Sequence, residues 1–576
     1  MPELTGVLDR PRSGWDLIRH YERGWLTADV LAGFTVAALL VPQCMAYAEV
    51  AGVPPATGFH AALLALVAYA VIGTSRHLGV GPEPGTAILA AAGVSGLVGA
   101  DQDPARYLTL MSALALTVAA VCFVAYVLRL GFLADLLSKP VLVGYITGVG
   151  LTLISSQISK FTAVRITTDT FFPRAWELVR NIDEIDGLTL GLGAASLAGI
   201  LALRRWYPRL PASLIVVALA GLVVALMSLD DHGISEIGAI PSGIPSLRIP
   251  DVALADLGSL LPIAFGIALV GYSDNVITAR SVAARLGYRI DPNRELLALG
   301  VENLASGVSR GFPISSSASR TGIAADLRSR TQLTGVIAAA TLALALVTMR
   351  PLLERIPTPA LAAVILAAGI AILDVPGYRD LWRVSRAEFG LAVIAALGVM
   401  IFDVLVGVLI AVVLSAVVAL YRMARPHDAV LGAAAGQEGW VDVDEVPGAT
   451  TLPGLLVYRF DAPLFFANTT RFDERLHAVL DANPGTERWV VLDFEGVGSV
   501  DATATDALFE ILASLRSAGV ATVAIARAND HVLDRLGRAR LLPPDGTLRT
   551  FLTINAAVRA FEEDSRPPPI SGNGAT

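Results

Sequence analysis

Apolar runs separated by short polar loops follow one another from residue 28 to residue 423. Because about 20 apolar residues suffice for a helix to cross a bilayer, the pattern predicts fourteen membrane-spanning helices. The third and the tenth are the weakest of them, because they are short and broken by Gly and Pro. The expected spans are 28–50, 58–73, 84–100, 107–128, 136–156, 187–203, 211–228, 256–279, 294–308, 313–326, 332–349, 358–374, 387–401 and 403–423.

The charges in the loops give a direction to these spans. Cytoplasmic loops of membrane proteins carry an excess of Lys and Arg. The loop from 280 to 294 holds four arginines, whereas the loop from 229 to 251 has acids at Asp230, Asp231 and Glu236 and a single arginine, Arg248. We therefore expect both termini to be cytoplasmic, in an inner or plasma membrane.

Composition supports an integral membrane protein and excludes several other classes. The chain has 576 residues, of which 54% are hydrophobic and 16% charged, with a mean hydropathy of +0.63. The net charge of −8 is spread over loops and the C-terminal part, so it indicates no nucleic-acid partner. Cys44 and Cys122 lie in apolar runs without metal-ligand spacing. We expect no cofactor, no bound metal and, without a catalytic triad or Walker motif, no enzyme.

Two Gly/Pro-broken stretches, 78–86 and 309–324, contain the starts of the third and tenth spans. They lie seven spans apart, and an odd offset inverts one half of the protein relative to the other. Such interrupted segments at corresponding positions point to a binding site at the membrane midplane. Because helix N-termini present free N–H groups and the positive end of the helix dipole, we expect an anion as the ligand.

The second stretch also carries a cation among hydroxyl groups. Arg320 can contribute positive charge, and Ser316, Ser317 and Ser319 can donate hydrogen bonds. An arginine at the bilayer centre costs about 3 kcal/mol on the lenient insertion scale, so it normally faces a cavity or pathway. The alternatives are an arginine that reaches toward lipid headgroups and serines that serve close helix packing.

After residue 424 the chain becomes polar, and its last third has a different pattern. We expect a cytosolic N-terminal segment over 1–27, a transmembrane domain over 28–424, a linker over 425–452, a small α/β domain over 453–563 and a disordered tail over 564–576. Apolar strands that alternate with helices predict a sheet covered on its faces.

Several motifs occur together and in order. The stretches 41–55, 73–77, 139–145, 315–320 and 330–332 resemble the sulfate permease family, also called solute carrier family 26, and 457–468 resembles its STAS domain. The resemblance implies a seven-plus-seven inverted repeat with core and gate subdomains. It also implies a homodimer and elevator-type transport of an anion.

The resemblance assigns roles to individual residues. Arg320 matches a family position where a basic residue lies by the anion, and Gln43 and Tyr47 match positions that line the pocket. Gln43 and Tyr47 are four residues apart and so share one helix face, although Tyr47 would also suit packing. Thr86, at the start of the third span, is a further candidate for substrate binding.

Two acidic residues are candidates for ion coupling. Glu83 departs from the family pattern, where many relatives have an apolar residue, and Asp274 matches a family position that is often acidic. An ionised Glu83 would repel an anion, so its protonation could couple proton and anion movement. For Asp274 the alternative is an ion pair with Arg320 that neutralises an empty site.

In the STAS part, Asp501 is followed by Ala502, where soluble relatives carry a phosphorylatable serine. The sequence therefore argues against phosphorylation there, although Thr503 is adjacent. Asp501 is expected to cap the following helix.

The function that this sequence favours is proton-coupled uptake of an inorganic oxyanion, with sulfate first. Sodium-coupled transport of bicarbonate and transport of a C4-dicarboxylate remain open. A membrane-tethered signalling platform, in which the STAS domain does the work, is the alternative from another class.

Overall fold

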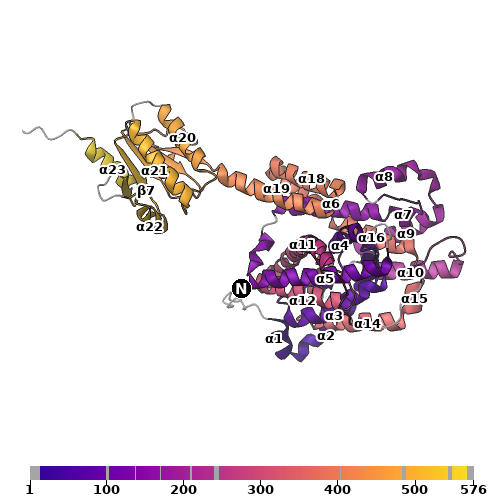
Figure 1. Ribbon diagram of the computed structural model, residues 1–576. Helices are drawn as coiled ribbons and strands as arrows, with labels where there is room; N and C mark the ends of the chain where they lie inside the picture. The colour runs from indigo at the N-terminus through magenta and orange to yellow at the C-terminus, as the bar shows by residue number, and fades with distance from the viewer. Residues whose placement is uncertain are drawn as a thin grey trace, which may run out of the picture. The chain divides into compact units, whose positions relative to one another are not determined.

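The structure is a computed structural model, and it divides into two units, residues 1–415 and residues 416–576, which we describe separately (Figure 1). It describes residues 13–98, 103–135, 138–168, 170–207, 210–238, 246–402, 404–434, 436, 439–482, 488–542 and 548–566. Residues 1–12 of the expected N-terminal segment and 567–576 of the expected tail lie outside these ranges.

The first unit is helical, with one pair of two-residue strands. Each of the fourteen expected spans corresponds to a helix, and within the part of the chain that the structure describes six helical stretches are long and apolar enough to cross a membrane by length and composition. Its elements are α1 (Gly14–Arg19), α2 (Leu26–Val50), α3 (Ala56–Ile72), β1 (Val80–Gly81), α4 (Pro84–Val98), α5 (Pro104–Val127), α6 (Lys139–Ser156), α7 (Ile158–Thr162), α8 (Phe171–Arg180), α9 (Gly187–Trp206), α10 (Ala212–Met227), α11 (Leu254–Leu286), α12 (Pro292–Val308), β2 (Ser315–Ser316), α13 (Ala318–Asp326), α14 (Leu333–Thr348), α15 (Arg350–Glu354), α16 (Thr358–Ile372), α17 (Val375–Val384), α18 (Arg386–Phe402) and α19 (Val404–Ala424), the last of which runs into the second unit.

These helices pack in two groups. In the first, α12 lies against α5 and α3, α14 against α2 and α3, and α11 against α4 and α5. In the second, α16 packs on α9 and α6, and α18 packs on α6. Glycines allow the closest approaches: a Cβ on Gly307 of α12 would lie 2.6 Å from Leu116 of α5, in keeping with the use of small residues between membrane helices.

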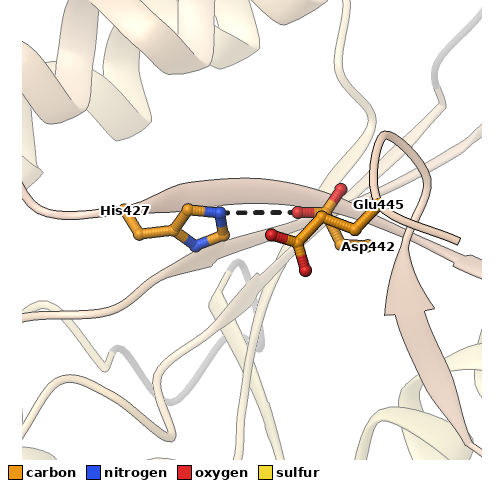
Figure 2. Close-up of side chains that lie close together, drawn as sticks. All are labelled: His427, Asp442 and Glu445. Atoms are coloured by element: carbon orange, nitrogen blue, oxygen red, sulfur yellow. Dashed lines mark ion pairs between the residues drawn. The ribbon is translucent and has the colours of Figure 1, made fainter. Parts of the chain in front are cut away.

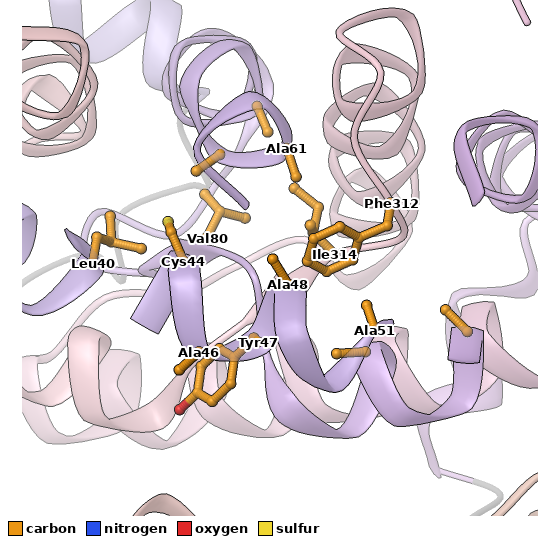
Figure 3. Close-up of a cluster of buried hydrophobic side chains, with 14 of the residues drawn as sticks. Leu40, Cys44, Ala46, Tyr47, Ala48, Ala51, Ala61, Val80, Phe312 and Ile314 are labelled. Carbon is orange, nitrogen blue, oxygen red and sulfur yellow. The ribbon is translucent and has the colours of Figure 1, made fainter. Parts of the chain in front are cut away.

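The core of the first group forms around the two short strands. Figure 3 shows Val80 of β1 and Ile314, which precedes β2, packed with Leu40 and Cys44 of α2 and Ala61 of α3. All five side chains are fully or almost fully buried. The irregular backbone is thus enclosed by protein, which is the condition for non-helical chain at membrane depth.

Polar contacts join the segment after α3 to the segment before α14. Gln332 donates from Nε2 to the carbonyl oxygens of Ser75 and Leu78, both at 3.0 Å. Nε2 of His77 lies 2.8 Å from the carbonyl oxygen of Ser329. Asp29 at the start of α2 accepts the N–H of Arg330 at 2.6 Å. These hydrogen bonds therefore connect the segment around residues 73–78 and the start of α2 to the segment around residues 329–332.

The second unit is a six-stranded sheet with helices on both faces, in the strand order β4-β3-β5-β6-β7-β8. Strands β5 to β8 are parallel, and β3 pairs antiparallel with both β4 and β5. Its elements are β3 (Asp428–Ala433), β4 (Trp440–Asp442), β5 (Leu455–Phe460), α20 (Thr469–Asp481), β6 (Trp489–Asp493), α21 (Ala502–Ser517), β7 (Thr522–Ala526), α22 (Asp530–Arg538), β8 (Leu548–Phe551) and α23 (Ile554–Asp564).

Alternate strand residues face opposite layers of this domain, as the two-residue period of a strand requires. Leu456 and Tyr458 of β5 pack with α20, α21 and α22. Leu455 and Val457 of the same strand pack on the other face with α23. The α/β domain expected from the sequence is confirmed.

The linker expected over 425–452 needs correction, because β3 and β4 lie within it. β3 is an integral strand: its Val430 lies opposite Tyr458 of β5. The sheet of the second unit thus begins about 25 residues earlier than expected. The pattern is hard to recognise because β3 ends in Gly-Ala and pairs with a strand that comes later in the chain.

A buried carboxylate links the C-terminal ends of the parallel strands. Asp493, at the end of β6, is fully buried and accepts hydrogen bonds from Nε of Arg459 at 3.0 Å and Nε of Arg527 at 2.9 Å. Glu495 pairs with the same Arg527 at 2.6 Å but is 60% exposed. The two acids make similar ion pairs at very different depths.

We expect Asp493→Asn to destabilise the C-terminal domain by about 3 kcal/mol, because it leaves two largely buried guanidinium groups without their shared charge. This corresponds to a roughly 100-fold rise in the unfolded population. Hydrogen exchange of the β6 and β7 amides in the full-length protein measures it. Glu495→Gln, an exposed pair, should change the same rates by less than about fivefold, and equal effects would contradict the assignment.

Candidate functional site

The two Gly/Pro-broken stretches of the sequence meet in the structure. β1 pairs antiparallel with β2, so that Val80 lies opposite Ser316 and Gly81 opposite Ser315. Each strand leads into a short helix, α4 after β1 and α13 after β2. The first turn of a helix has N–H groups without partners inside the helix. The pairing therefore brings two such helix ends together.

Two asparagine side chains make hydrogen bonds to the backbone of β2 and of the residue before it, as a neighbouring strand would. Asn303 of α12 binds Ile314 twice, donating to its carbonyl oxygen and accepting its N–H, both at 3.0 Å. Asn275 of α11 accepts the N–H of Ser316 at 2.8 Å. Neither residue was among the expected site residues, although an asparagine within an apolar helix indicates a buried polar partner.

Glu302 extends this support. Its Oε1 accepts from Nδ2 of Asn275 at 3.3 Å, and its side chain is fully buried. Oε2 has no partner among the described residues. About two turns earlier on the same helix, Glu295 accepts hydrogen bonds from the hydroxyl of Tyr69 at 2.9 Å and from the N–H of Thr74 at 2.8 Å. These two acids tie α12 to its neighbours, and neither was among the expected site residues.

Arg320 is fully buried in the first turn of α13 and spans the two halves of the site. Its Nη1 donates to Oε1 of Gln43 at 2.9 Å and to the carbonyl oxygen of Pro82 at 3.0 Å, and its Nε donates to the carbonyl oxygen of Gly79 at 3.2 Å. Nη2 has no partner among the described residues. The guanidinium thus braces the turn that connects β1 to α4.

Gly81 in this turn has a φ of +136°, a conformation that side chains disfavour. A Cβ there would lie 3.2 Å from Leu40 and 3.6 Å from Nη2 of Arg320. Glycine is therefore required by the backbone, and a Cβ would also be tight against Leu40.

A cavity of about 80 Å³ lies beside the paired strands. One water needs about 10–15 Å³ of such volume, so the cavity has room for a small ion and not for a large organic molecule. Residues of α4, β2 and α11 line one side, and residues of α6 and α16 line the other. The lining consists of Glu83, Gly85, Thr86, Leu142, Tyr145, Ile146, Val149, Val270, Gly271, Asp274, Ser315 and Ile372.

Glu83 caps the helix end that faces this cavity. Its Oε2 accepts the N–H groups of Gly85 at 2.8 Å and Thr86 at 3.1 Å. A carboxylate of the chain itself thus occupies the anion position at the start of α4. Asp274 of α11 lines the same cavity, and the structure shows no ion pair between Asp274 and Arg320 among the described residues.

Two buried hydroxyl groups in the cavity lining have no partner among the described residues. They belong to Ser315, in β2, and Tyr145, in α6. Buried polar groups are nearly always hydrogen-bonded, so each calls for an explanation. Both lie in stretches that the sequence analysis had singled out, but neither had been chosen as a site residue.

The expected site residues divide into those at the cavity and those beside it. Thr86, Glu83 and Asp274 line it. Ser316, in β2, is buried away from the cavity, and its hydroxyl has no partner among the described residues. Ser317 and Ser319 pair with each other at 2.9 Å nearer the surface. Gln43, Tyr47 and Arg320 are buried, but they do not line it.

In the C-terminal domain, Asp501 caps α21 as expected. Its Oδ1 accepts the N–H of Ala504 at 2.7 Å, and its Oδ2 accepts the N–H of Phe466 at 3.0 Å. Ala502 is the first residue of the helix. The strand-to-helix turn therefore has a structural role that needs no phosphorylation.

Comparisons with known proteins agree with this architecture. The model of the sulfate permease family matches residues 26–395, and that of the STAS domain matches residues 447–557. A probable sulfate transporter of Mycobacterium tuberculosis is 43% identical over 94% of this chain and 96% of its own length. Probable sulfate transporter 4.2 of Arabidopsis thaliana is 29% identical over 96% of this chain and 85% of its own.

Two solved structures share the fold at 20% identity. The murine solute carrier 26 family member A9 anion transporter, in its inward-facing state, matches 96% of this chain and 94% of its own with a TM-score of 0.88. The transmembrane domain of a cyanobacterial bicarbonate transporter matches 69% and 98% with a TM-score of 0.59. The chain therefore belongs to the sulfate permease family and is an integral membrane protein with a C-terminal STAS domain.

Proposed function

We propose that this protein is a secondary active transporter that takes up an inorganic oxyanion, and that sulfate is its preferred substrate. The observation that carries the proposal is the small cavity at the paired helix ends, where the hydroxyls of Ser315 and Tyr145 have no partner among the described residues and Glu83 accepts the N–H of Thr86. Hydrogen-bond donors at a helix N-terminus suit an oxyanion. The relatives named as sulfate transporters support the same substrate.

Arg320 acts in this proposal from just outside the cavity. Its guanidinium is buried and, among the described residues, donates to carbonyl oxygens and to Gln43, so it makes the neighbourhood positive while it fixes the turn before α4. We assign Gln43 to positioning Arg320. Ser316 of β2 supplies an additional buried hydroxyl, and Tyr47, Ser317 and Ser319 have secondary roles.

Coupling to protons follows from the position of Glu83. An ionised carboxylate and an oxyanion compete for the same N–H groups of α4, and they repel each other. Binding of the anion therefore favours a protonated Glu83, and Asp274 in the same cavity is subject to the same repulsion. Each anion would enter with at least one proton.

The packing groups of the helices suggest how the anion moves. The cavity lies where α4, α11 and β2 of one group face α6 and α16 of the other. We propose that the first group slides past the second and carries the cavity with it, as an elevator does. We also propose a homodimer in the cell membrane with both termini in the cytoplasm, on the basis of the family and of the loop charges.

Uptake by the purified protein in liposomes tests the proposal. We expect labelled sulfate to accumulate under an imposed pH gradient, acid outside, and bicarbonate and fumarate to accumulate at least about tenfold more slowly. Uptake of bicarbonate driven by a sodium gradient would replace the proposal with the sodium-coupled alternative, and preferred uptake of fumarate would indicate a dicarboxylate carrier. No uptake of any anion would favour the signalling platform.

A further inference from the structure

Three side chains of the second unit converge beside the first strand of its sheet (Figure 2). His427 immediately precedes β3, Asp442 ends β4, and Glu445 lies in the turn that follows. One ligand atom from each lies within 4.8 Å of the other two. They are 15 and three residues apart in the chain and meet because β3 and β4 pair antiparallel.

Hydrogen bonds outside the cluster orient two of these groups. Nδ1 of His427 lies 3.1 Å from Oδ2 of Asp461, and a carboxylate only accepts, so Nδ1 carries the proton of the neutral ring. The lone pair then lies on Nε2, which faces Oδ2 of Asp442 at 3.5 Å. The other oxygen of Asp442, Oδ1, accepts the N–H of Asp444 at 2.8 Å.

This arrangement is the usual surrounding of a metal-binding histidine. A ligating imidazole commonly donates its other N–H to a carboxylate, which fixes the ring and its tautomer. Two atoms bound at about 2.0–2.2 Å to one tetrahedral zinc ion lie roughly 3.4 Å apart, close to the 3.5 Å between His427 and Asp442. Glu445 is exposed and on a turn, so its carboxylate can close the remaining gap.

We propose that His427, Asp442 and Glu445 form a binding site for a divalent transition metal ion, with zinc as the preferred ion. Asp461 is the positioning residue for His427. One imidazole and two carboxylates favour zinc over magnesium, which prefers oxygen ligands alone. A water molecule completes the four ligands. The ion joins the start of β3 to the end of β4 and so stabilises the edge of the sheet.

A proton is the competitor at this site. The hydrogen bond to Asp461, together with the charges of Asp461, Asp442 and Glu445, raises the pKa of His427 above its ordinary value. Metal binding requires the unprotonated Nε2, so we expect zinc affinity to fall as the pH decreases through this raised pKa. The affinity should therefore be higher at pH 8 than at pH 6.

Zinc binding to the full-length protein in detergent tests the proposal, with a purification tag that contains no histidine and a colorimetric zinc chelator as competitor. We expect the wild type to bind one zinc ion per chain that His427→Ala does not bind. Glu445→Gln, at an exposed position, should weaken binding at least about tenfold without affecting folding. Asp461→Asn should weaken it about 10- to 100-fold, and millimolar magnesium should not displace the zinc.

The chain provides a matched control in His477. It also contacts a carboxylate, with Nδ1 2.9 Å from Asp473 Oδ1, but its Nε2 faces the hydroxyl of Ser514 at 2.8 Å and no second acid. His477→Ala should bind zinc as the wild type does and show the same rise in unfolding temperature with zinc. Equal zinc binding by wild type, His427→Ala and Glu445→Gln would overturn the proposal.

Discussion

Replacing Arg320 by methionine is expected to reduce sulfate uptake to the background of empty liposomes. Methionine fills much of the volume but removes the donors to Gly79, Pro82 and Gln43. Each buried acceptor left unpaired costs about 1–3 kcal/mol, so the turn between β1 and α4 should lose its fixed shape. The positive charge beside the cavity disappears as well. Initial rates of labelled sulfate uptake measure the effect.

Two further variants separate charge from geometry. Arg320→Lys keeps the charge but cannot reach three acceptors with one ammonium group, so we expect at least about a tenfold loss of rate. Arg328, eight residues further on and exposed, provides the control, and Arg328→Met should transport as the wild type does. Uptake within twofold of wild type by Arg320→Met, in protein that remains monodisperse, would refute the role of the guanidinium.

The second large effect concerns the pH dependence of uptake. Glu83→Gln retains a carbonyl oxygen that can accept the N–H groups of Gly85 and Thr86, so α4 remains capped. It cannot take up or release a proton. If one proton moves with each anion, the wild-type uptake rate should change by up to about tenfold per pH unit over the pH range in which proton binding limits the rate. The variant should lose this slope of rate against pH. We expect Asp274→Asn to reduce the slope as well.

Glu49 provides the matched control for this experiment. It also lies in a membrane helix, α2, but pairs with Lys160 at 2.8 Å and does not line the cavity. Glu49→Gln should therefore keep the wild-type pH slope. If Glu83→Gln and Asp274→Asn both retained the full slope, proton coupling through these acids would be wrong, and a requirement for sodium would then be measured under the same conditions.

The sequence predicts the helices of the first unit well because each one is a long apolar run. It also predicts that stretches 78–86 and 309–324 belong together, since both break a span at corresponding positions. It could not predict their pairing partners. Asn275 lies 41 residues from Ser316 and Asn303 lies 11 residues from Ile314, and a polar residue in an apolar helix does not show which strand it will contact.

Arg320 illustrates a different limit. The sequence shows that a buried guanidinium must find acceptors, but backbone carbonyls and a bound oxyanion both meet that need. The structure assigns its donors to Gly79, Pro82 and Gln43. The His427 cluster was missed for a related reason: its members are neighbours only through the β3–β4 pairing, in a stretch that was expected to be a linker.

The carboxylate of Glu83 on the first turn of α4 has a consequence for the return half of the transport cycle. After the cargo has left, the helix end keeps an acceptor for its N–H groups, so the vacant carrier can reset without exposed donors in a dry environment. In a carrier without such a carboxylate, a second anion bound during the return step would be needed to accept these N–H groups. Under the proposed function, we therefore expect little stimulation of sulfate efflux by sulfate on the opposite side.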